Sequence, residues 1–424
     1  MEVKKYKLGD CFIMAENGVV IKQSKEAKGL PITRIETLSN DCFNRDRLGY
    51  ANIFDEEKYK HYILDDMDLI MSHINSRTFL GRTVLYRKIG NERIIHGMNV
   101  LRIKTNQVIL SPIFAYYFFK TRFFKKCIDS IRKDAINQSS FALSDLKNLE
   151  IKIPTIEEQQ KIVYTLQLLD KKISTNTSIN DNLEAMAKQL YDYWFVQFDF
   201  PNEEGKPYKS SGGAMVWNEK LKREIPKGWF CGTLLDIAEY TNGLACQKYR
   251  PTDDNKLPVI KIKEMHDGLS VDTEWVKADI PDDVKVFDGD VLFSWSASLE
   301  VMLWAYGNGG LNQHIFKVTS KNGYPRSFYF YQLVHYIGVF KQMAEARKTT
   351  MGHITQDHLR QSTIVLPPDV DIANKLEEKL CPIFDAIVKN SQEIMTLTKQ
   401  RDELLPLLMN GQATVNYHLS DDWH

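Results

Sequence analysis

The side chains of this sequence that could take part in recognition chemistry are basic, amide and small polar residues in the segments between predicted strands. Arginine can donate two hydrogen bonds to guanine, and asparagine or glutamine can pair with adenine. These residue types therefore predict contact with the edges of DNA bases. The alternatives are solvated side chains, or phosphate contacts that position a protein without specifying sequence. The candidates are Asn75, Arg77, Arg82, Arg87, Lys248, Arg250, Trp295, Ser296, Gln313 and His314.

Two short polar loops are further candidates for DNA contact. The first contains Asn137, Gln138, Ser139 and Ser140, and the second contains Lys348, Thr349 and Thr350. Each lies shortly before a long predicted helix, where a plain turn is the alternative interpretation. Two aromatic segments, 114–124 and 328–339, are predicted helices whose rings could stack on bases, although aromatic residues at helical spacing favour a buried core.

No pattern in the sequence predicts a catalytic centre. The phosphate-loop, zinc-protease, nucleophile-elbow and dinucleotide-binding motifs are all absent. Asp283 and Lys285 form a nuclease-like Asp-x-Lys, but the neighbouring carboxylate of Asp282 favours a surface turn. The cysteines and histidines show no metal-ligand spacing. We therefore expect no catalytic residue, no metal site and no cofactor bound by this chain itself.

The sequence repeats itself, so the candidate residues are predicted to lie on two copies of one order of elements. Three segments recur in the same order: LPITRI (30–35) as LPVIKI (257–262), MDLIMS (67–72) as GDVLFS (289–294), and LEIKIP (149–154) as STIVLP (362–367). The common order favours duplication over chance similarity. Both copies are predicted to be mixed α/β, because short β-branched runs alternate with helical segments.

A long helix with a seam of residues at alternating intervals of four and three is predicted after each copy. This spacing is typical of a coiled coil, and a polar residue in the seam fixes its register. Antiparallel pairing needs no long return of the chain between the helices, so it is favoured over parallel pairing; two separate amphipathic helices are the alternative. Pro382 and Pro406 predict kinks or breaks in the second helix. The seam residues are Ile162, Leu166, Leu169, Ile173, Asn176, Leu183 and Leu190 in the first helix, and Leu376, Leu380, Ile383, Ile387, Asn390, Ile394, Leu397, Leu404 and Leu408 in the second.

These elements predict an α/β (α+β) fold of two tandem globular domains separated by two long helices. The helices form an antiparallel coiled coil with pseudo-two-fold symmetry. Residues 199–215, rich in Pro, Gly, Ser and charge, are expected to be a linker with little core to bury. The predicted segments are a first globular domain at 1–155, a helix at 156–198, the linker at 199–215, a second globular domain at 216–368, a helix at 369–412 and a tail at 413–424.

Basic residues concentrate in the first predicted domain. Residues 1–155 carry 26 Lys and Arg against 18 Asp and Glu, whereas residues 216–368 carry 18 of each, and the whole chain has a net charge of zero. This surplus fits nucleic acid, unless it is chance variation among solvated faces. No signal peptide and no apolar run of about 18 residues is present, so we expect no membrane contact and a cytoplasmic protein. The scattered cysteines fit a reducing compartment.

Four segments carry a resemblance to the specificity subunits of type I restriction-modification systems. YDYWFVQFDFP (191–201) with GKPYKSSG (205–212) resembles the central conserved region of that family, and EIPKGW (224–229) resembles the start of its second target-recognition domain. RDELLPLLMNGQ (401–412) is similar to its C-terminal helix end, and the run from Leu149 to Ile162 to its junction of domain and helix. The resemblance extends over essentially the whole chain.

Membership of that family would imply a subunit without catalysis that binds double-stranded DNA. Each target-recognition domain would read one half of a bipartite DNA sequence. The helices would set the spacer and dock two adenine methyltransferase subunits, which bind S-adenosylmethionine. Restriction subunits that use ATP and Mg²⁺ and cut DNA would join them. A stand-alone sequence-specific DNA-binding protein and a coiled-coil scaffold are the alternatives.

Overall fold

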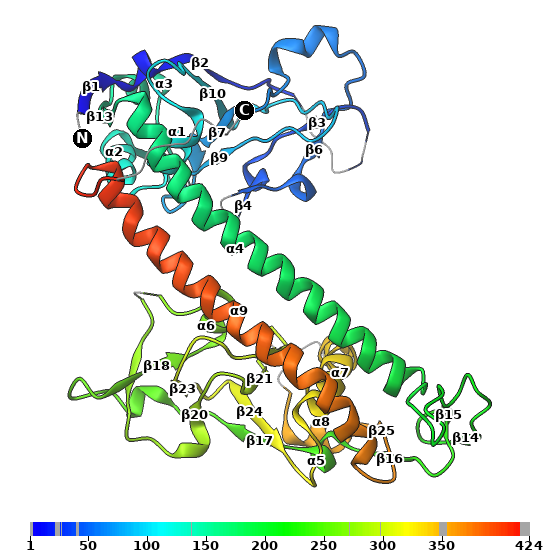
Figure 1. Ribbon diagram of the computed structural model, residues 1–424. Coiled ribbons are helices and arrows are strands. Elements are labelled where there is room, and N and C mark those ends of the chain that lie inside the picture. Colours follow the sequence, from blue (N-terminus) through cyan, green and yellow to red (C-terminus); the bar gives the residue numbers. More distant parts are fainter. Residues whose placement is uncertain are drawn as a thin grey trace. The chain divides into compact units, whose positions relative to one another are not determined.

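The computed structural model describes residues 3–21, 26, 28–39, 42–136, 138–270, 272–296, 298–346 and 354–415. Its contacts divide the chain into unit 1, which combines Met1–Lys171 with Thr398–His424, and unit 2, which is Lys172–Leu397. Both boundaries fall inside the two long helices, α4 (Ile156–Tyr191) and α9 (Asp371–Met409), drawn in Figure 1. Each unit therefore contains one globular domain and a part of each long helix.

The core of unit 1 is a four-stranded antiparallel sheet with apolar side chains on both faces. Its order is β2 (Phe12–Asn17), β10 (Val100–Thr105), β7 (Leu69–Ser72) and β9 (Thr83–Leu85). Because side chains alternate between the faces of a strand, Leu69 and Met71 of β7 join one apolar cluster and Ile70 joins another. A continuous apolar run such as β7 is what a strand buried on both faces requires.

Aromatic helices cover one face of this sheet. The predicted helix at 114–124 is instead two helices, α1 (Pro112–Phe119) and α2 (Arg122–Ile131). They are separated at Thr121, whose side chain caps α2 by accepting a hydrogen bond from the Phe124 amide at 3.2 Å. Phe114 and Phe124 are buried in the same cluster as Leu69. Most of the aromatic residues in this segment are therefore core residues.

Shorter elements complete unit 1. β1 (Val3–Lys7) pairs with β13 (Glu150–Pro154), directly before α4, and α3 (Leu143–Asn148) precedes β13. The pairs β3 (Pro31–Ile32) with β6 (Gly49–Tyr50), and β4 (Leu38–Ser39) with β5 (Cys42–Phe43), lie between β2 and β7 in the sequence. A further small sheet has the order β11 (Lys133–Asp134), β12 (Ser139–Ser140) and β8 (Ile74–Asn75).

Unit 2 repeats the plan of unit 1. Its antiparallel sheet has the order β17 (Ala238–Asn242), β24 (Ile315–Ser320), β21 (Val291–Ser294) and β22 (Glu300–Leu303). Helix α7 (Arg326–Ala346) contributes its buried aromatic residues to the same cluster as Val291 and Phe293. β16 (Phe230–Gly232) pairs with β25 (Ile364–Leu366) before α9, as β1 pairs with β13 before α4. The equal strand order establishes two copies of one mixed α/β domain.

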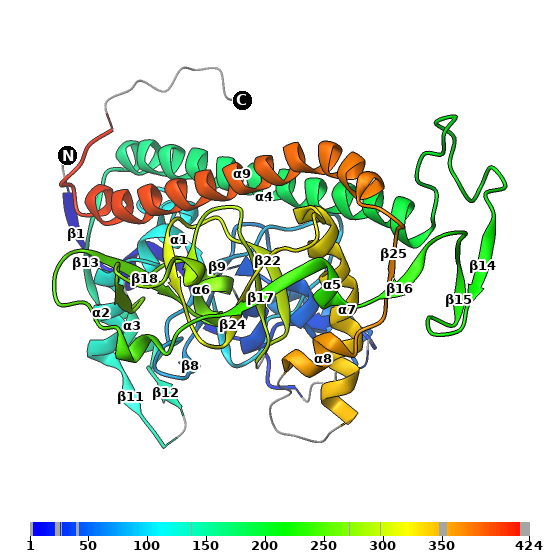
Figure 2. The same cartoon turned by 90° about the horizontal axis from the view of Figure 1, so that it is seen from below.

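Unit 2 also has elements of its own. A mixed sheet has the order β19 (Trp275–Lys277), β18 (Lys256–Ile260), β23 (Gly309–Leu311) and β20 (Lys285–Val286), in which β18 and β23 run parallel. Short helices α5 (Leu234–Ile237), α6 (Ile262–Asp267) and α8 (Gln356–Arg360) lie between strands, and β14 (Met215–Asn218) forms a hairpin with β15 (Arg223–Pro226). Figure 2 shows this hairpin beyond the end of α4.

The long helices pair in opposite directions within each unit. In unit 2, Asn176 donates a hydrogen bond to Glu393 at 2.8 Å, and Asn180 donates to Ser391 at 3.0 Å and to the Ile387 carbonyl at 3.2 Å. In unit 1, Arg401 donates to Asp170 at 3.0 Å. Later residues of α4 therefore contact earlier residues of α9, as expected for antiparallel helices. α9 runs through Pro382 and Pro406 as one helix, so the expected break is absent.

The segment expected to be a linker, 199–215, folds onto the core of unit 2. Phe198 and Phe200 are buried in that core, and the Phe200 ring stacks on Tyr208 at 4.7 Å and on Trp229 at 5.1 Å. Asp199 accepts hydrogen bonds from the amide and hydroxyl of Ser210. The prediction that this segment buries little surface was wrong. It rested on the Gly and Ser content, whereas the aromatic residues of the segment supply the buried surface.

Candidate nucleic-acid interface

A projecting hairpin in unit 1 joins two groups of candidate residues that are distant in the sequence. Strands β11 and β12 form this hairpin, and Ser139 of β12 pairs with Asn75 of β8. Figure 2 shows the hairpin standing out from the body of unit 1. Gln138 is exposed near the tip, where its carbonyl accepts a hydrogen bond from the Ala135 amide at 2.9 Å. The structure therefore presents Asn75 and Ser140 on one small sheet, with Gln138 in the turn that precedes β12.

Charged residues fix the base of this hairpin. Asp134 accepts hydrogen bonds from the Ser139 hydroxyl and from Arg132 Nε, both at 2.7 Å. The Ser139 hydroxyl, followed by Arg132, lowers the pKa of the Asp134 carboxyl. Arg132 also contacts Asp129. A carboxylate held in this way keeps its charge and holds the two strands together, which leaves the tip of the hairpin free for contact.

Ile136 at the tip was missed by reasoning from the sequence. Its side chain is fully exposed (101%). A single isoleucine in a polar turn gives no periodic signal, so only the geometry of the hairpin reveals it. Apolar side chains at such positions can contact thymine methyl groups or enter between base steps.

The three arginines predicted after β7 do not form one group. Arg77 is exposed, on a turn whose carbonyls accept hydrogen bonds from Lys125. Arg82 is half-buried, donates to the Leu38 carbonyl at 3.1 Å and lies 4.1 Å from the Phe79 ring centre. Arg87 pairs with Asp66 at 3.2 Å. The structure thus gives Arg82 and Arg87 intramolecular partners and leaves Arg77 directed outward.

Four candidates in unit 2 come together at the equivalent place. The Trp295 amide donates to the His314 carbonyl at 3.3 Å, and the two rings are 5.6 Å apart. Gln313 Nε2 lies 3.3 Å from His314 Nε2. Ser296, which follows Trp295 in the sequence, is buried. Trp295 Nε1 donates to Asn242 at 3.0 Å. Asn242, at the end of β17, was missed because no local pattern distinguishes it from any strand-end asparagine.

The other candidates are placed elsewhere or not described. Lys248 and Arg250 are exposed on the segment between β17 and β18, and no interaction joins them to Trp295 among the described residues. Asn137, Lys348, Thr349 and Thr350 lie outside the described residues.

One backbone hydrogen bond marks the same site in both domains. The Phe141 amide, before α3, donates to the His73 carbonyl, after β7, at 3.2 Å. In unit 2 the Ile354 amide, before α8, donates to the Trp295 carbonyl, after β21, at 3.0 Å. Both bonds tie the segment before a short helix to the end of the corresponding strand. In unit 1 this bond places the candidate segment before α3 against the segment after β7, whereas the candidates Lys348, Thr349 and Thr350 of unit 2 lie outside the described residues.

The predicted seam residues of the long helices all face inward to some degree. In unit 1, Ile162, Leu166 and Leu408 are buried in one cluster, with Leu404 packed against it. In unit 2, the buried seam residues are Asn176, Leu376, Leu380, Ile387 and Leu397, and the half-buried ones are Ile173, Leu183, Leu190, Ile383, Asn390 and Ile394. Leu169 of unit 1 is half-buried too. Asn390 donates to Asn180 rather than to Asn176.

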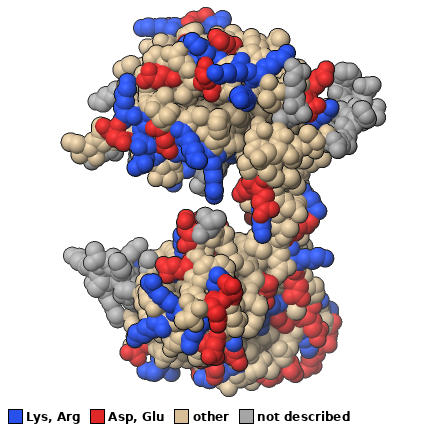
Figure 3. All heavy atoms as spheres, turned by 90° about the vertical axis from the view of Figure 1, so that its left-hand side faces the viewer, with Lys and Arg blue, Asp and Glu red and all other residues tan. Residues whose placement is uncertain are grey.

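The charge of the two units differs as the sequence predicts. On the face shown in Figure 3, Lys and Arg side chains are spread over the unit 1 body, whereas the unit 2 body carries prominent acidic side chains.

Within the described part of the chain, no group of three or more His, Cys, Asp or Glu side chains could hold a metal ion. No described helix is long and apolar enough to span a membrane.

Comparison with known proteins identifies the family. A model described as the type I restriction modification DNA specificity domain matches residues 1–185 and 226–400. The putative type I restriction enzyme MjaX specificity subunit of Methanocaldococcus jannaschii is 28% identical over 431 residues, which cover 96% of this chain and 93% of that protein. The MjaIX specificity subunit of the same organism is 29% identical over 316 residues, or 71% of this chain and 69% of that protein.

A solved structure has the same fold. The type I restriction-modification S subunit from M. genitalium aligns with a TM-score of 0.57 and 14% identity over 96% of each chain. The two family matches coincide with the two copies of the mixed α/β domain and their helices. On the length and repetition of these matches, the chain belongs to the family of type I restriction-modification DNA specificity subunits.

Proposed function

We propose that this chain reads a bipartite DNA sequence on behalf of a type I restriction-modification complex and performs no catalysis itself. Unit 1 and unit 2 would each contact one half of the target, through the segments after β7 and β21. The observation that carries this proposal is the equivalent hydrogen bond from Phe141 to His73 and from Ile354 to Trp295. It ties the segment before a short helix to the end of the corresponding strand at the same place in two copies of one domain.

The proposal assigns the chemistry to partner subunits. Two methyltransferase subunits would dock along α4 and α9 and supply S-adenosylmethionine, and restriction subunits would supply ATP hydrolysis, Mg²⁺ and DNA cleavage. A complex that acts on cellular DNA would lie in the cytoplasm. The names of the matched relatives, all specificity subunits of type I restriction enzymes, support this division of labour.

Co-purification with the methyltransferase encoded beside it, followed by mapping of methylated adenines across the genome, tests the proposal. We expect a stable complex and a split motif with a fixed gap, which disappears when this chain is deleted. Tight and sequence-specific binding of duplex DNA by the isolated chain, without any complex or dependent methylation, would instead establish a stand-alone DNA-binding protein.

A further inference from the structure

Unit 2 contains a cavity of about 630 Å³ between its helices and strand β22. Leu303 of β22, Phe330 and Val334 of α7, and Phe384 and Ile387 of α9 form apolar walls. Such a space favours the aliphatic part of an incoming side chain, because contact with these walls removes apolar surface from water.

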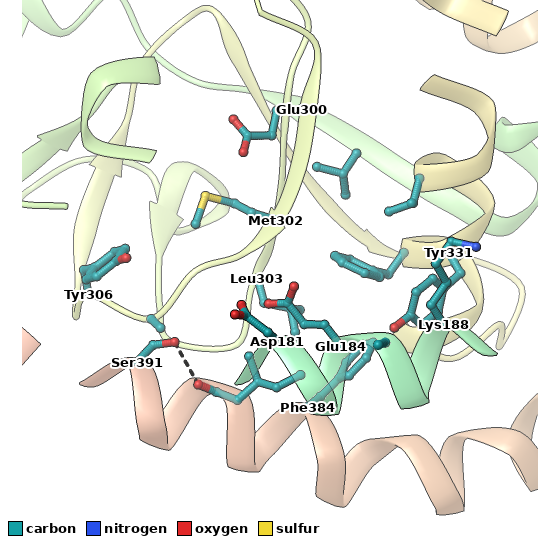
Figure 4. Close-up of a pocket in the computed structure, with 16 residues that line it drawn as sticks. Asp181, Glu184, Lys188, Glu300, Met302, Leu303, Tyr306, Tyr331, Phe384 and Ser391 are labelled. Atoms are coloured by element: carbon teal, nitrogen blue, oxygen red, sulfur yellow. Dashed lines mark hydrogen bonds between the residues drawn. The ribbon is translucent and has the colours of Figure 1, made fainter. Parts of the chain in front are cut away.

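Two carboxylates of α4 line the same cavity. Asp181 and Glu184 lie three residues apart, and therefore on one face of the helix. Figure 4 shows their carboxylates close together and directed into the cavity, with Lys188 on its other side. Burial, and then the charge of Asp181, raises the pKa of Glu184. Both side chains are also exposed to solvent, which screens part of their repulsion, and a cation bound between them would relieve the rest.

The basic side chains nearest to Asp181 and Glu184 interact with other residues. Lys188 pairs with Asp192 at 2.5 Å, and His335 contacts the other oxygen of Asp192 at 2.6 Å. The third carboxylate of the cavity, Glu300, lies 3.1 Å from His266 Nε2, and its Oε2 has no hydrogen-bond partner among the described residues. Among the residues that the structure describes, none forms an ion pair with Asp181 or Glu184.

We propose that this cavity receives an arginine side chain of the methyltransferase subunit, whose guanidinium binds Asp181 and Glu184. The inference rests on the function proposed above. The apolar walls suit the aliphatic stem of arginine, and its planar fork of donors suits two neighbouring carboxylates. DNA is excluded as the occupant, because the carboxylates repel its phosphates. The binding energy of this contact would help to anchor the partner on α4.

The internal repeat provides a matched comparison for this site. The seam residues of the two helices lie 214 residues apart, as Ile162 and Leu376 do, and at this spacing Asp181 and Glu184 of α4 correspond to Met395 and Thr398 of α9. Neither carries a charge. The acidic pair is therefore present in one repeat only.

The test is the affinity of the full chain for the purified methyltransferase, measured by titration calorimetry at several salt concentrations. In Asp181→Asn/Glu184→Gln we expect the dissociation constant to rise about tenfold or more, as loss of a charged hydrogen-bonded contact implies. Its salt dependence should also become weaker. Glu184→Lys should raise the constant further. Glu378→Gln, an exposed carboxylate of α9 outside the cavity, should bind as the wild type does.

The variants should fold, because Glu184→Gln removes a repulsion and adds none, so its thermal midpoint should equal or exceed that of the wild type. Equal affinity of the double variant and Glu378→Gln would overturn the cavity assignment, whereas failure of the wild type to bind would contradict the proposed function itself. A rise in the midpoint of the wild type with millimolar spermidine, absent from the double variant, would assign the cavity to a small polyamine and overturn the proposed protein partner.

Discussion

Ile136 is the most exposed large apolar side chain of unit 1 in the described chain, and it lies at the tip of the β11–β12 hairpin. Asn75 pairs with Ser139 of this hairpin, and Gln138 lies in its turn. An exposed apolar residue on the same hairpin as these amides can contact the edge of a base next to the one that they hydrogen-bond. At the scale of single residues, this tip is where unit 1 would meet its half of the target.

Ile136→Ala should weaken binding of the assembled complex to its target about tenfold, since a specific base contact contributes roughly 1–3 kcal/mol. Binding to unrelated DNA should not change. Fluorescence anisotropy with both duplexes measures the two affinities. Val108→Ala, another exposed apolar residue of unit 1 (82%), is the control and should have no effect on either. Equal affinities of the wild type and Ile136→Ala for the target would exclude the contact.

Glu92 makes the stability of unit 1 depend on pH. It accepts hydrogen bonds from Arg45 at 2.6 and 2.9 Å and from the Tyr86 hydroxyl at 2.9 Å. The Arg45 guanidinium is the main cause that lowers the pKa of Glu92 to about 2. A carboxylate whose pKa is lower in the folded state stabilises fully above its unfolded pKa, and loses this effect as the pH falls toward the folded value.

Glu92→Gln should therefore lower the free energy of unfolding by about 2 kcal/mol at pH 7. The difference from the wild type should shrink as the pH falls from about 4.5 to about 2. Urea denaturation across this range measures it. Glu57→Gln is the control, because Glu57 is exposed and its pair with Lys60 spans 3.8 Å. A constant difference at all pH values would show that the effect of Glu92 is not due to its charge.

At the scale of elements, the pairing of α4 with α9 depends on half-buried as well as buried seam residues. Leu169, Ile173 and Leu183 are half-buried, whereas their neighbour Leu168 is exposed (49%). Charged residues at the three seam positions would have to lose water against apolar neighbours, which is costly. The proposed docking of methyltransferase subunits relies on these helices.

Leu169→Glu/Ile173→Glu/Leu183→Glu should disrupt the helix pair and prevent assembly with the methyltransferase. Size-exclusion chromatography of the mixed subunits measures assembly, and circular dichroism measures the loss of helix. Leu168→Glu should assemble normally, because its side chain is already in water. An intact complex of the triple variant would contradict the role of the seam.

Periodic elements could be predicted from the sequence, and irregular ones could not. The seam spacing predicted both long helices, because burial repeats every few residues over their whole length. The break at Thr121 and the burial of Phe198 and Phe200 depend on local capping and on distant partners, which leave no period. For the same reason the candidate list included Arg82 and Arg87, whose partners Leu38 and Asp66 are revealed only by the fold.

At the scale of the whole molecule, the two domains have one topology, one hydrogen bond in common and different side chains at the candidate site. Near the shared hydrogen bond, Asn75, Ser139 and Ser140 lie in unit 1, whereas Trp295, Gln313 and His314 lie in unit 2. A shared frame with different polar side chains is suited to reading two different half-sites. The duplication was visible in the sequence, but the individual contacts were not, because no short motif encodes them.

Replacement of residues 1–155 by the first domain of another family member should change one half of the methylated motif and leave the other half and the gap unchanged. The reason is that each domain carries its own candidate site, while the helices are retained. Sequencing that detects methylated adenine in cells expressing the hybrid measures both halves. A change in both halves would contradict independent reading by the two domains.

The distance in sequence between the paired helices has a consequence for synthesis of the chain. α4 ends at Tyr191 and α9 begins only at Asp371. A ribosome that adds roughly 5–20 residues per second needs about 10–40 seconds to make the chain between them. Throughout this interval Ile173 and Leu183 lack their partner helix, so the nascent protein offers an apolar stripe to chaperones or to a second copy of itself. Faster translation of the second domain would shorten this exposure and raise the yield of correctly paired protein.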